Sequence, residues 1–451
     1  MRHVVAAAVA LTASACATID PSRGHTEVAA LVDERIGAKT GWDRGTPDDA
    51  AIQKHVDELL SGGLTVDHAI AIALINNPGL QRTYEELGVS QADLVQAGLW
   101  SNPGLEAHVG LALPGEGISE LNGGLVMDFL QLFVLPLRKR VAEEQFDADV
   151  LRVAHEALGV AAEVDRQFRE VQAREKLVAL RRSVVDGEAA SAELAQQLFA
   201  AGNITQLELA SRRARYEEAR VALGREELAL VEAREDLNKL LGLWGARTSW
   251  KLAAELPPLP EKDPPLEHLE ATAIRQRLDI EAARLQRALM WKAVELARST
   301  RWFGQIEVGV DAHRDADGPR LLGPTLSLEL PVFDQRQAVI ARLEAQFRQA
   351  ERRLDELSID ARSDVRRSVA RLGFLRQTVE HYRKVVLPLR EEVLEQAQLQ
   401  YNGMQIGLFE LVQAKQEQVD AYATYIEAVR DYWQERAQLR RLVGGRIRDS
   451  E

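Results

Sequence analysis

The chain has 451 residues, 46% of them hydrophobic, so it is long enough for two or three ordinary domains with a large core. Its formal net charge of −13 argues against a nucleic-acid partner, because phosphate binding requires clustered positive charge. Only 5% of the residues are aromatic, and Ala, Glu, Leu, Arg and Gln dominate. This composition is typical of long helices, and we expect a mainly α-helical fold.

The first 16 residues have the organisation of a secretory signal. A basic start, Met1-Arg2-His3, precedes an apolar run and the small residues Ala13-Ser14-Ala15. Cys16 follows directly and is the only cysteine, which excludes an internal disulfide and a cysteine-based zinc cluster. The segment resembles a bacterial lipoprotein signal, which implies lipidation at Cys16, although Ala13 stands where such signals usually have Leu. The alternative is an ordinary export signal with a cysteine near its cleavage site.

An internal repeat follows residues 17–64, which we expect to form an N-terminal extension or linker. The first unit covers residues 65–243 and the second covers residues 266–445, with a linker at 244–265 and a tail at 446–451. Residues 204–209 correspond to residues 406–411, and Leu80, Ala97 and Gly104 correspond to Ile280, Ala297 and Gly304. One structural unit is therefore expected twice.

The first unit is predicted to begin with a helix over residues 79–100, between the start signal Asn76-Asn77-Pro78 and the stop signal Ser101-Asn102-Pro103-Gly104. A hairpin is expected over residues 104–133, because two runs have apolar residues at alternate positions. This is the pattern of a strand with one solvent-exposed face. These residues are Leu105, Ala107, Val109, Leu111 and Leu113 in one strand and Leu125, Met127 and Phe129 in the other. Pro114-Gly115-Glu116-Gly117 is expected to form the turn between them.

Long helices are predicted after both hairpins. In the first unit a helix over residues 137–200 leads to the turn Ala201-Gly202-Asn203 and a return helix over residues 204–242. The second unit is expected to begin with a helix, followed by a hairpin over residues 304–332 and a long helix over residues 335–400. The turn Asn402-Gly403-Met404 and a return helix over residues 406–444 complete it. Apolar residues in the long helices recur every three or four positions, as in a coiled coil. Pro388 is expected to kink the second long helix or loosen one turn.

Helix lengths predict how these pieces are arranged. Each long helix would span about 95 Å, whereas a return helix covers about 60 Å and the helix before a hairpin about 36 Å. Two short helices stacked end to end would therefore match one long helix, with the hairpin at one end of the rod and the glycine-containing turn at the other.

Two hairpins provide only four strands per chain, which leaves exposed strand edges. Three chains would supply twelve strands, enough to close a barrel with an aqueous interior. The expected fold class is therefore mainly α, with long coiled-coil-like helices, a two-fold internal repeat and four strands per protomer, completed by a trimeric twelve-stranded barrel and an α-helical tunnel.

The sequence resembles the TolC-like outer-membrane factors of tripartite efflux and type I secretion systems over about residues 66–445. The resemblance rests on Asn76-Asn77-Pro78, on Leu328-Glu329-Leu330-Pro331-Val332-Phe333-Asp334 after the last strand, and on the duplicated turn motifs that contain Gly202 and Gly403. It implies a homotrimeric duct in the outer membrane that extends into the periplasm. The implied partners are outer-membrane lipid, a periplasmic adaptor and an inner-membrane pump of the RND type or similar.

The resemblance also implies site residues. The adaptor is expected to contact the helical tips, at Gly202, Asn203, Ile204, Gly403, Met404, Gln405 and Ile406. Gly202 and Gly403 are also expected to terminate helices, as glycine commonly does. Relatives carry acidic rings at the periplasmic aperture, and the matching positions are Glu410 and Gln413, so the second carboxylate is missing. A ring of three Glu410 side chains would favour cations, and a solvated surface glutamate is an equally good interpretation.

An enzyme is the first alternative, and the chain contains no HExxH, GxSxG, P-loop or dinucleotide motif, so we expect no catalysis, cofactor or resident metal. A periplasmic coiled-coil adaptor or scaffold is the second alternative, since it too would have long helices, but duplicated units fit the duct better. The cargo is left open between metal ions and drugs. His108 and His313 lie in the strand regions, and without metal-ligand spacing they argue only weakly for metal handling.

Overall fold

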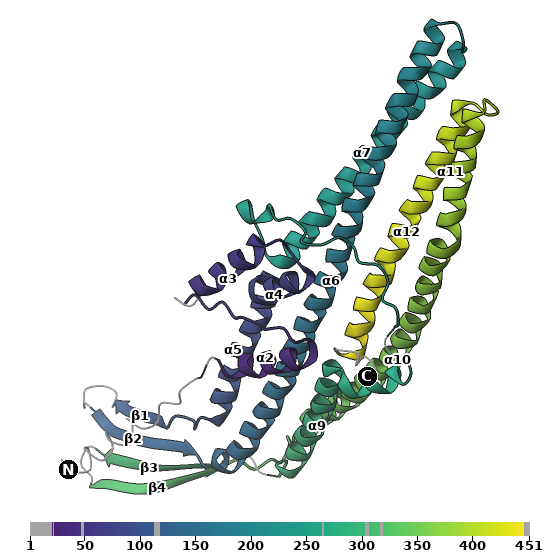
Figure 1. Ribbon diagram of the computed structural model, residues 1–451. Helices are drawn as coiled ribbons and strands as arrows, with labels where there is room; N and C mark the ends of the chain where they lie inside the picture. The colour runs from purple at the N-terminus through teal and green to yellow at the C-terminus, as the bar shows by residue number, and fades with distance from the viewer. Residues whose placement is uncertain are drawn as a thin grey trace. The chain divides into compact units, whose positions relative to one another are not determined.

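The computed structural model describes residues 20, 22–46, 49–111, 118–263, 266–302, 306–315 and 319–445. These residues form a mainly helical chain with one four-stranded antiparallel sheet, as the sequence predicts (Figure 1). The chain divides into two compact units. The first comprises Met1–Val28, Tyr84–Val153 and Leu278–Ser358, and the second comprises Ala29–Thr83, Ala154–Arg277 and Ile359–Glu451. Cys16 and the expected turn at residues 114–117 lie outside the described residues.

The sheet belongs to the first unit. Its strands are β1 (Gly104–Leu111), β2 (Ile118–Asp128), β3 (Ile306–Asp315) and β4 (Arg320–Leu328), paired in that order. Pairing between β2 and β3 joins the two hairpins, with Leu125 opposite Val310. Residues directly opposite each other in an antiparallel sheet project to the same face, so this register determines the composition of both faces.

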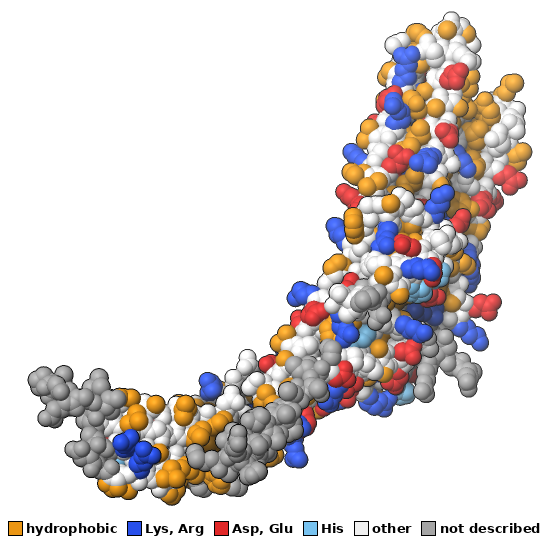
Figure 2. All heavy atoms as spheres, turned by 90° about the vertical axis from the view of Figure 1, so that its left-hand side faces the viewer, with side chains coloured by type: hydrophobic (Ala, Val, Ile, Leu, Met, Phe, Trp, Pro, Cys, Tyr) orange, Lys and Arg blue, Asp and Glu red, His pale blue; other side chains and the backbone are white. Residues whose placement is uncertain are grey.

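One face of the sheet is apolar and exposed. Ten of its large apolar side chains are 36–79% exposed: Leu105, Val109, Leu121, Leu125, Met127, Val308, Val310, Leu322, Leu326 and Leu328. Arg314 and Arg320, opposite Leu121 in the register, lie on the same face at one end. In Figure 2 hydrophobic side chains gather over the strands, with a small group of basic side chains among them, and charged side chains of both signs are spread along the helices.

The opposite face is polar and acidic. Its described residues include Glu106, His108, Glu120, Asn122, Asp128, Glu307, Asp311 and His313. Among the described strand residues, none of those on this face is a lysine or an arginine.

The long helices are α6 (Leu130–Ala200) and α10 (Gln337–His381). The hairpin expected to reach residue 133 is too long, because β2 ends at Asp128 and α6 begins at Leu130 rather than at residue 137. Pro136 therefore lies within α6. Pro136 lies in the second turn, where a proline removes a backbone donor and crowds the preceding turn, yet α6 continues through it.

The expected disturbance at Pro388 is confirmed. A π-helical segment at Tyr382–Val386 separates α10 from α11 (Leu387–Asn402). The Leu387 N–H donates to the Tyr382 carbonyl oxygen, five residues earlier. The wider π turn accommodates the missing donor of Pro388 without breaking the helix.

The remaining long helices are α7 (Gln206–Leu241) and α12 (Leu408–Val443). In the second unit α7 pairs with α6, where Arg174 Nη1 donates to Glu226 Oε1 at 2.8 Å. Helix α6 also contacts α12, where Arg181 Nη1 donates to Asp420 Oδ1 at 3.1 Å. Helix α12 contacts α11, where the Tyr422 hydroxyl donates to Glu391 Oε1 at 2.6 Å. The order across this unit is therefore α7, α6, α12 and α11, with α7 and α11 outermost.

Residues before position 65 are folded, in contrast to the extension or linker expected from the sequence. They contain α2 (Arg23–Ile36) and α3 (Asp49–Ser61), followed by α4 (Val66–Asn76). Val56 of α3 and Leu64 are buried in a core with Phe168 and Leu237. Helices this short are marginal alone, so tertiary packing rather than local sequence stabilises them.

The expected linker at residues 244–265 also has structure. It contains a 3₁₀ turn, Gly245–Thr248, and Leu252 forms a parallel bridge with Leu64. Asp263 accepts hydrogen bonds from Arg376 Nε at 2.7 Å and Nη2 at 3.1 Å. These bonds raise the pKa of the Arg376 guanidinium, and they attach this segment to α10. Helix α8 (Leu269–Gln276) follows and leads to α9 (Leu278–Ser299) of the first unit.

The start signal Asn76-Asn77-Pro78 joins two helices end to end. Asn77 Oδ1 accepts from the Leu80 N–H at 2.8 Å at the start of α5 (Pro78–Gly98), while Asn77 Nδ2 donates to the Leu240 carbonyl oxygen at 2.7 Å. Asn76 Nδ2 donates to the carbonyl oxygens of Leu241 and Gly242 at 2.8 and 2.9 Å. The two side chains thus satisfy backbone groups at the start of α5 and at the end of α7.

Candidate functional site

The first helical tip is a fully capped turn. Gly202 has φ +74°, its N–H donates to Phe199 O at 2.9 Å, and the Asn203 N–H donates to Leu198 O at 2.8 Å. These two bonds form a Schellman motif, for which glycine in the left-handed region is preferred. Thr205 then caps α7 in a capping box, in which Glu208 Oε2 accepts from the Thr205 N–H at 2.7 Å.

The second tip has the same hydrogen bonds around a different residue. The Met404 N–H donates to Tyr401 O and the Gln405 N–H donates to Gln400 O, both at 2.9 Å. Met404 has φ +56°, whereas Gly403 has φ −82°. Gly403 is the C-cap of α11, as expected for a glycine that ends a helix, but Met404 rather than Gly403 takes the left-handed position that Gly202 has at the first tip. A left-handed conformation costs a residue with a Cβ about 1–2 kcal/mol.

All seven predicted tip residues lie in these two turns. Gly202, Asn203, Gly403, Met404 and Gln405 are exposed, while Ile204 and Ile406 are partly buried. Met404 is 95% exposed, and Leu207 in the first turn of α7 is 78% exposed. Apolar side chains held in water on rigid turns are suited to contact with a partner protein.

A buried arginine lies close to the predicted aperture residue Glu410. Arg212 of α7 is 7% exposed, and its guanidinium carbon lies 3.3 Å from the centre of the Phe409 ring in α12. Burial lowers the pKa of this guanidinium, and the charge of Arg215 lowers it further. The negative charges of Glu188, Glu410 and Glu208 act in the opposite direction and raise the pKa. Within the described residues, the buried atoms Arg212 Nη1 and Glu188 Oε2 have no hydrogen-bond partner.

The second predicted aperture residue, Gln413, lines a groove of about 510 Å³ between three helices. Its Nε2 donates to Glu417 Oε1 at 3.2 Å. The groove is formed by Arg181, Val184 and Glu188 of α6, by Arg215, Glu218, Ala219 and Ala222 of α7, and by Gln413, Gln416, Glu417 and Asp420 of α12. Glu410 and Gln413 therefore lie on the helix that packs against the α6–α7 pair. The sequence analysis missed Arg212 and Glu188, for which the Ser211-Arg212-Arg213-Ala214-Arg215 cluster was the available signal.

This arrangement of long paired helices and a two-faced sheet recurs in known proteins. Residues 270–445 match the family described as outer membrane efflux protein. Through this segment the chain is similar to outer membrane efflux proteins. It is 23% identical over 390 residues to the cobalt-zinc-cadmium resistance protein CzcC of Cupriavidus metallidurans, covering 85% of this chain and 91% of that protein.

Solved structures share the fold of this chain. The CmeC outer membrane channel of Campylobacter jejuni superimposes with a TM-score of 0.74 at 15% identity, covering 88% of each chain. The outer membrane protein VceC of Vibrio cholerae superimposes with a TM-score of 0.69 at 15% identity, covering 85% of this chain and 97% of that one.

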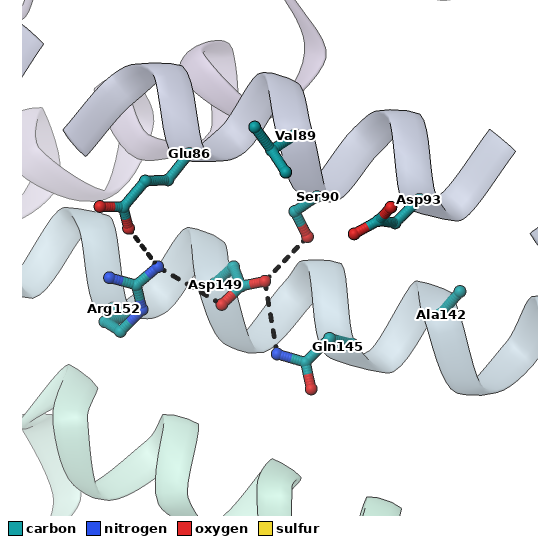
Figure 3. Close-up of a pocket in the computed structure, with 8 residues that line it drawn as sticks. All are labelled: Glu86, Val89, Ser90, Asp93, Ala142, Gln145, Asp149 and Arg152. Atoms are coloured by element: carbon teal, nitrogen blue, oxygen red, sulfur yellow. Dashed lines mark hydrogen bonds and ion pairs between the residues drawn. The ribbon is translucent and has the colours of Figure 1, made fainter. Parts of the chain in front are cut away.

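A polar pocket of about 360 Å³ lies between α5 and α6 (Figure 3). Arg152 Nη2 donates to Glu86 Oε2 at 2.7 Å, and Asp149 Oδ2 accepts from Ser90 Oγ at 2.8 Å and from Gln145 Nε2 at 3.3 Å. The polar side chains of this pocket bond to one another across the two helices. We therefore interpret it as a helix-to-helix contact rather than a ligand site.

In the described ranges, no three or more His, Cys, Asp or Glu side chains are grouped so that they could hold a metal ion. Across the same part of the chain, no helix is both long enough and apolar enough to span a bilayer.

Proposed function

We propose that this chain is one subunit of a homotrimeric channel in the bacterial outer membrane, with a twelve-stranded barrel and an α-helical tunnel that extends into the periplasm. The observation that carries the proposal is the sheet, which combines an exposed apolar face, an acidic opposite face and two unpaired edges. An outward apolar band and a polar interior are what a barrel needs in a bilayer.

The sheet edges support a trimer. Within the described residues, β1 and β4 each pair with one strand only, so the outer edge of each carries unsatisfied backbone groups. Pairing β1 of one subunit with β4 of the next would satisfy both edges. Because the two edges differ, the contact is head to tail, and such contacts form a ring when the rotation from one subunit to the next closes after a whole number of subunits.

The outermost helices of the second unit support the same ring. Helix α7 exposes an apolar stripe that includes Leu207, Val221, Leu228 and Val231. Helix α10, the π-helical segment after it and helix α11 expose a second stripe that includes Phe374, Val385, Leu389 and Val393. Apolar stripes at helical spacing normally pack against another helix. We infer that the α7 stripe of one subunit covers the α10–α11 stripe of its neighbour, which would form the wall of the tunnel.

The order helix, two strands, long helix and shorter helix occurs twice along the chain, which supports the proposed internal repeat over residues 65–243 and 266–445. Each unit would contribute one hairpin to the barrel and one helical pair to the tunnel. Three subunits would then contribute twelve strands, above the smallest closed barrels of about eight strands.

The channel would work with two other proteins. The tip residues Gly202, Asn203, Ile204, Gly403, Met404, Gln405 and Ile406 are our candidates for contact with a periplasmic adaptor, which joins an inner-membrane pump. Lipidation of Cys16 would add an anchor in the outer membrane. Glu410 would form an acidic ring at the periplasmic aperture, with Gln413 one turn further along α12. We infer no catalytic activity for the chain.

Divalent transition-metal cations are the cargo that we favour. CzcC, the relative named for cobalt, zinc and cadmium resistance, matches nearly the full length of this chain. The acidic face of the sheet would attract cations into the pore, because like-signed charges along a channel concentrate the opposite ion.

The proposal is tested on the full chain expressed in a Gram-negative host. We expect it in the outer-membrane fraction as a trimer that cross-links on its surface and conducts ions in planar bilayers. Leu228→Glu in the α7 stripe should reduce trimer yield strongly, whereas the control Lys54→Glu on the exposed side of α3 should not. A soluble monomer without conductance would instead favour a periplasmic adaptor or scaffold.

A further inference from the structure

We propose that His108 and His313, on either side of Asn122 on the acidic face of the sheet, form a transient binding point for divalent transition-metal cations inside the pore. The inference rests on the proposed channel function, because the acidic face lines the pore only if three sheets close into a barrel. It adds a ligand site to that function, and the sequence pattern alone did not reveal it.

The strand register aligns the three side chains. His108 of β1 is directly opposite Asn122 of β2, and Asn122 is directly opposite His313 of β3. Neighbouring strands are about 4.8 Å apart, so the two histidine backbones are separated by about 10 Å across the sheet. All three side chains project to the same face. The two histidines are 205 positions apart in the sequence, and the β2–β3 pairing between the hairpins brings them into one row.

His313 is held in the tautomer that binds metals. Its Nδ1 contacts Asn122 Oδ1 and lies 3.4 Å from Glu120 Oε1. Asn122 Nδ2 donates to Glu120 Oε1 at 2.7 Å, which orients the amide so that its oxygen faces the imidazole. With two oxygen acceptors beside it, Nδ1 carries the proton, and in the neutral ring the lone pair is then on Nε2. Histidines that bind metal commonly donate their second ring nitrogen to an oxygen in this way.

The surroundings of the row favour a cation. The adjacent row consists of Glu106, Gly124 and Asp311, so two carboxylates flank a residue without a side chain. The absence of lysine and arginine from this face, noted above for the described strands, leaves these charges unopposed there. Carboxylate charge would attract any cation, whereas imidazole nitrogen prefers zinc, cobalt, nickel or copper over magnesium. We therefore expect cation binding at this row to depend on the chemistry of the metal as well as on its charge.

The geometry predicts weak binding. Two imidazoles on backbones about 10 Å apart can share one ion, at the usual Zn–N distance of about 2.0–2.1 Å, only if both side chains lean toward each other, and His313 is already held at Asn122. A single imidazole with nearby carboxylates would hold a metal only briefly. Conduction requires that an ion bind well enough to enter and weakly enough to leave. In the trimer, three such rows would present six imidazoles around the pore, so that an ion could pass from one to the next.

The experiment uses the detergent-solubilised trimer of the wild-type chain. Diethyl pyrocarbonate, which reacts with unprotonated imidazole nitrogen, is added with Zn²⁺ or with Mg²⁺, and the modification rate of each histidine is measured by mass spectrometry of its peptide. We expect Zn²⁺ to slow modification of His108 and His313 several-fold and Mg²⁺ to leave both rates unchanged. His55, on the exposed side of α3, is the internal control.

Two variants separate coordination from charge. Glu120→Gln should weaken zinc protection of His313 by about tenfold, because the partner of a metal-binding histidine typically contributes 10–100-fold to affinity. Asp311→Asn should lower the overall attraction of cations but keep the preference for Zn²⁺ over Mg²⁺. Equal rates with and without Zn²⁺, or equal protection by both metals, would overturn the inference. If no trimer forms, it is the proposed channel function that fails, independently of the labelling result.

Discussion

The guanidinium of Arg212 stacks on the ring of Phe409 and so connects the helix that leaves the first tip with the helix that leaves the second. The stacked pair lies near the buried Glu188, and within the described residues Glu188 Oε2 has no hydrogen-bond partner. The two tips are therefore joined through a buried charge rather than through an apolar core alone.

Arg212→Ala should loosen both tips together. It removes the stacked group and a positive charge that acts on the buried Glu188, and we expect this to destabilise the tips by about 1–3 kcal/mol. We expect faster amide hydrogen exchange in the first turns of both α7 and α12. Arg212→Met, which keeps the bulk without the charge, should cost less. Exchange that changes only in α7 would mean that the stacking does not join the tips.

Met404→Gly should stabilise the second tip. Met404 has a left-handed backbone, and glycine adopts it without the Cβ penalty of about 1–2 kcal/mol. We therefore expect slower hydrogen exchange at the end of α11. The matched change at the first tip, Gly202→Ala, should destabilise that turn by a similar amount. If Met404 contacts the adaptor, Met404→Gly should also weaken adaptor binding while it stabilises the turn, and the two effects can be measured separately.

Asn77→Ala should destabilise the junction between α5 and α7. The substitution removes a helix N-cap, worth about 1 kcal/mol, and leaves the Leu240 carbonyl oxygen without the Asn77 donor, which costs about 1–3 kcal/mol. Thermal denaturation and hydrogen exchange near residue 240 measure the effect. Asn203→Ala, at an exposed tip position, is the control and should change stability by less than half as much. An equal loss of stability in Asn77→Ala and Asn203→Ala would argue against a stabilising role for the junction between α5 and α7.

Gln413→Glu should increase cation selectivity of the proposed pore, because it restores a second carboxylate one turn from Glu410. Glu410→Gln should decrease it. Reversal potentials under a salt gradient in planar bilayers measure both changes, which should shrink at high ionic strength as screening increases. Unchanged reversal potentials in both variants would mean that Glu410 is a solvated surface residue away from the conduction path.

The capping box at the first tip should be sensitive to acid. Hydrogen bonds from the Thr205 backbone N–H and hydroxyl lower the pKa of Glu208 from its ordinary value of 4.5. A carboxylate with a lowered pKa stabilises the folded turn above the ordinary value and loses this effect as the pH falls through the lowered one. Hydrogen-exchange protection at the start of α7 should therefore decrease at low pH. Glu208→Gln should remove most of this pH dependence.

Local sequence patterns were sufficient to predict much of the fold. The alternation of Leu105, Ala107 and Val109 predicted β1, because a strand with one apolar face repeats every two residues. Gly202 predicted the end of α6, because glycine is favoured in the left-handed region. Pro388 predicted the irregular turn before α11, because proline lacks a backbone donor. Each of these features depends on residues that are close together in the chain.

Other features depend on residues that are far apart. Gly403 ends α11 as its local sequence predicted, but the left-handed residue of the second tip is Met404, which the sequence pattern did not indicate. The segment before residue 65 looked like a linker because α2 and α3 are short, and packing against distant residues such as Phe168 stabilises them. Asn76 and Asn77 indicated a helix start from sequence. Their side-chain amides also donate to carbonyl oxygens at the end of α7, more than 160 residues later, which the local sequence does not indicate.

The candidate sites also differ in whether they depend on residues close together or far apart in the chain. The turn motifs identified the tip residues from sequence, since turns are local structures. Arg212 looked like one of several surface arginines until packing buried it against Phe409, and His108 and His313 became neighbours of Asn122 only through strand register. Burial and register arise from pairing between distant segments, so the sequence by itself determined the elements and their turns, and the tertiary structure decided which side chains meet.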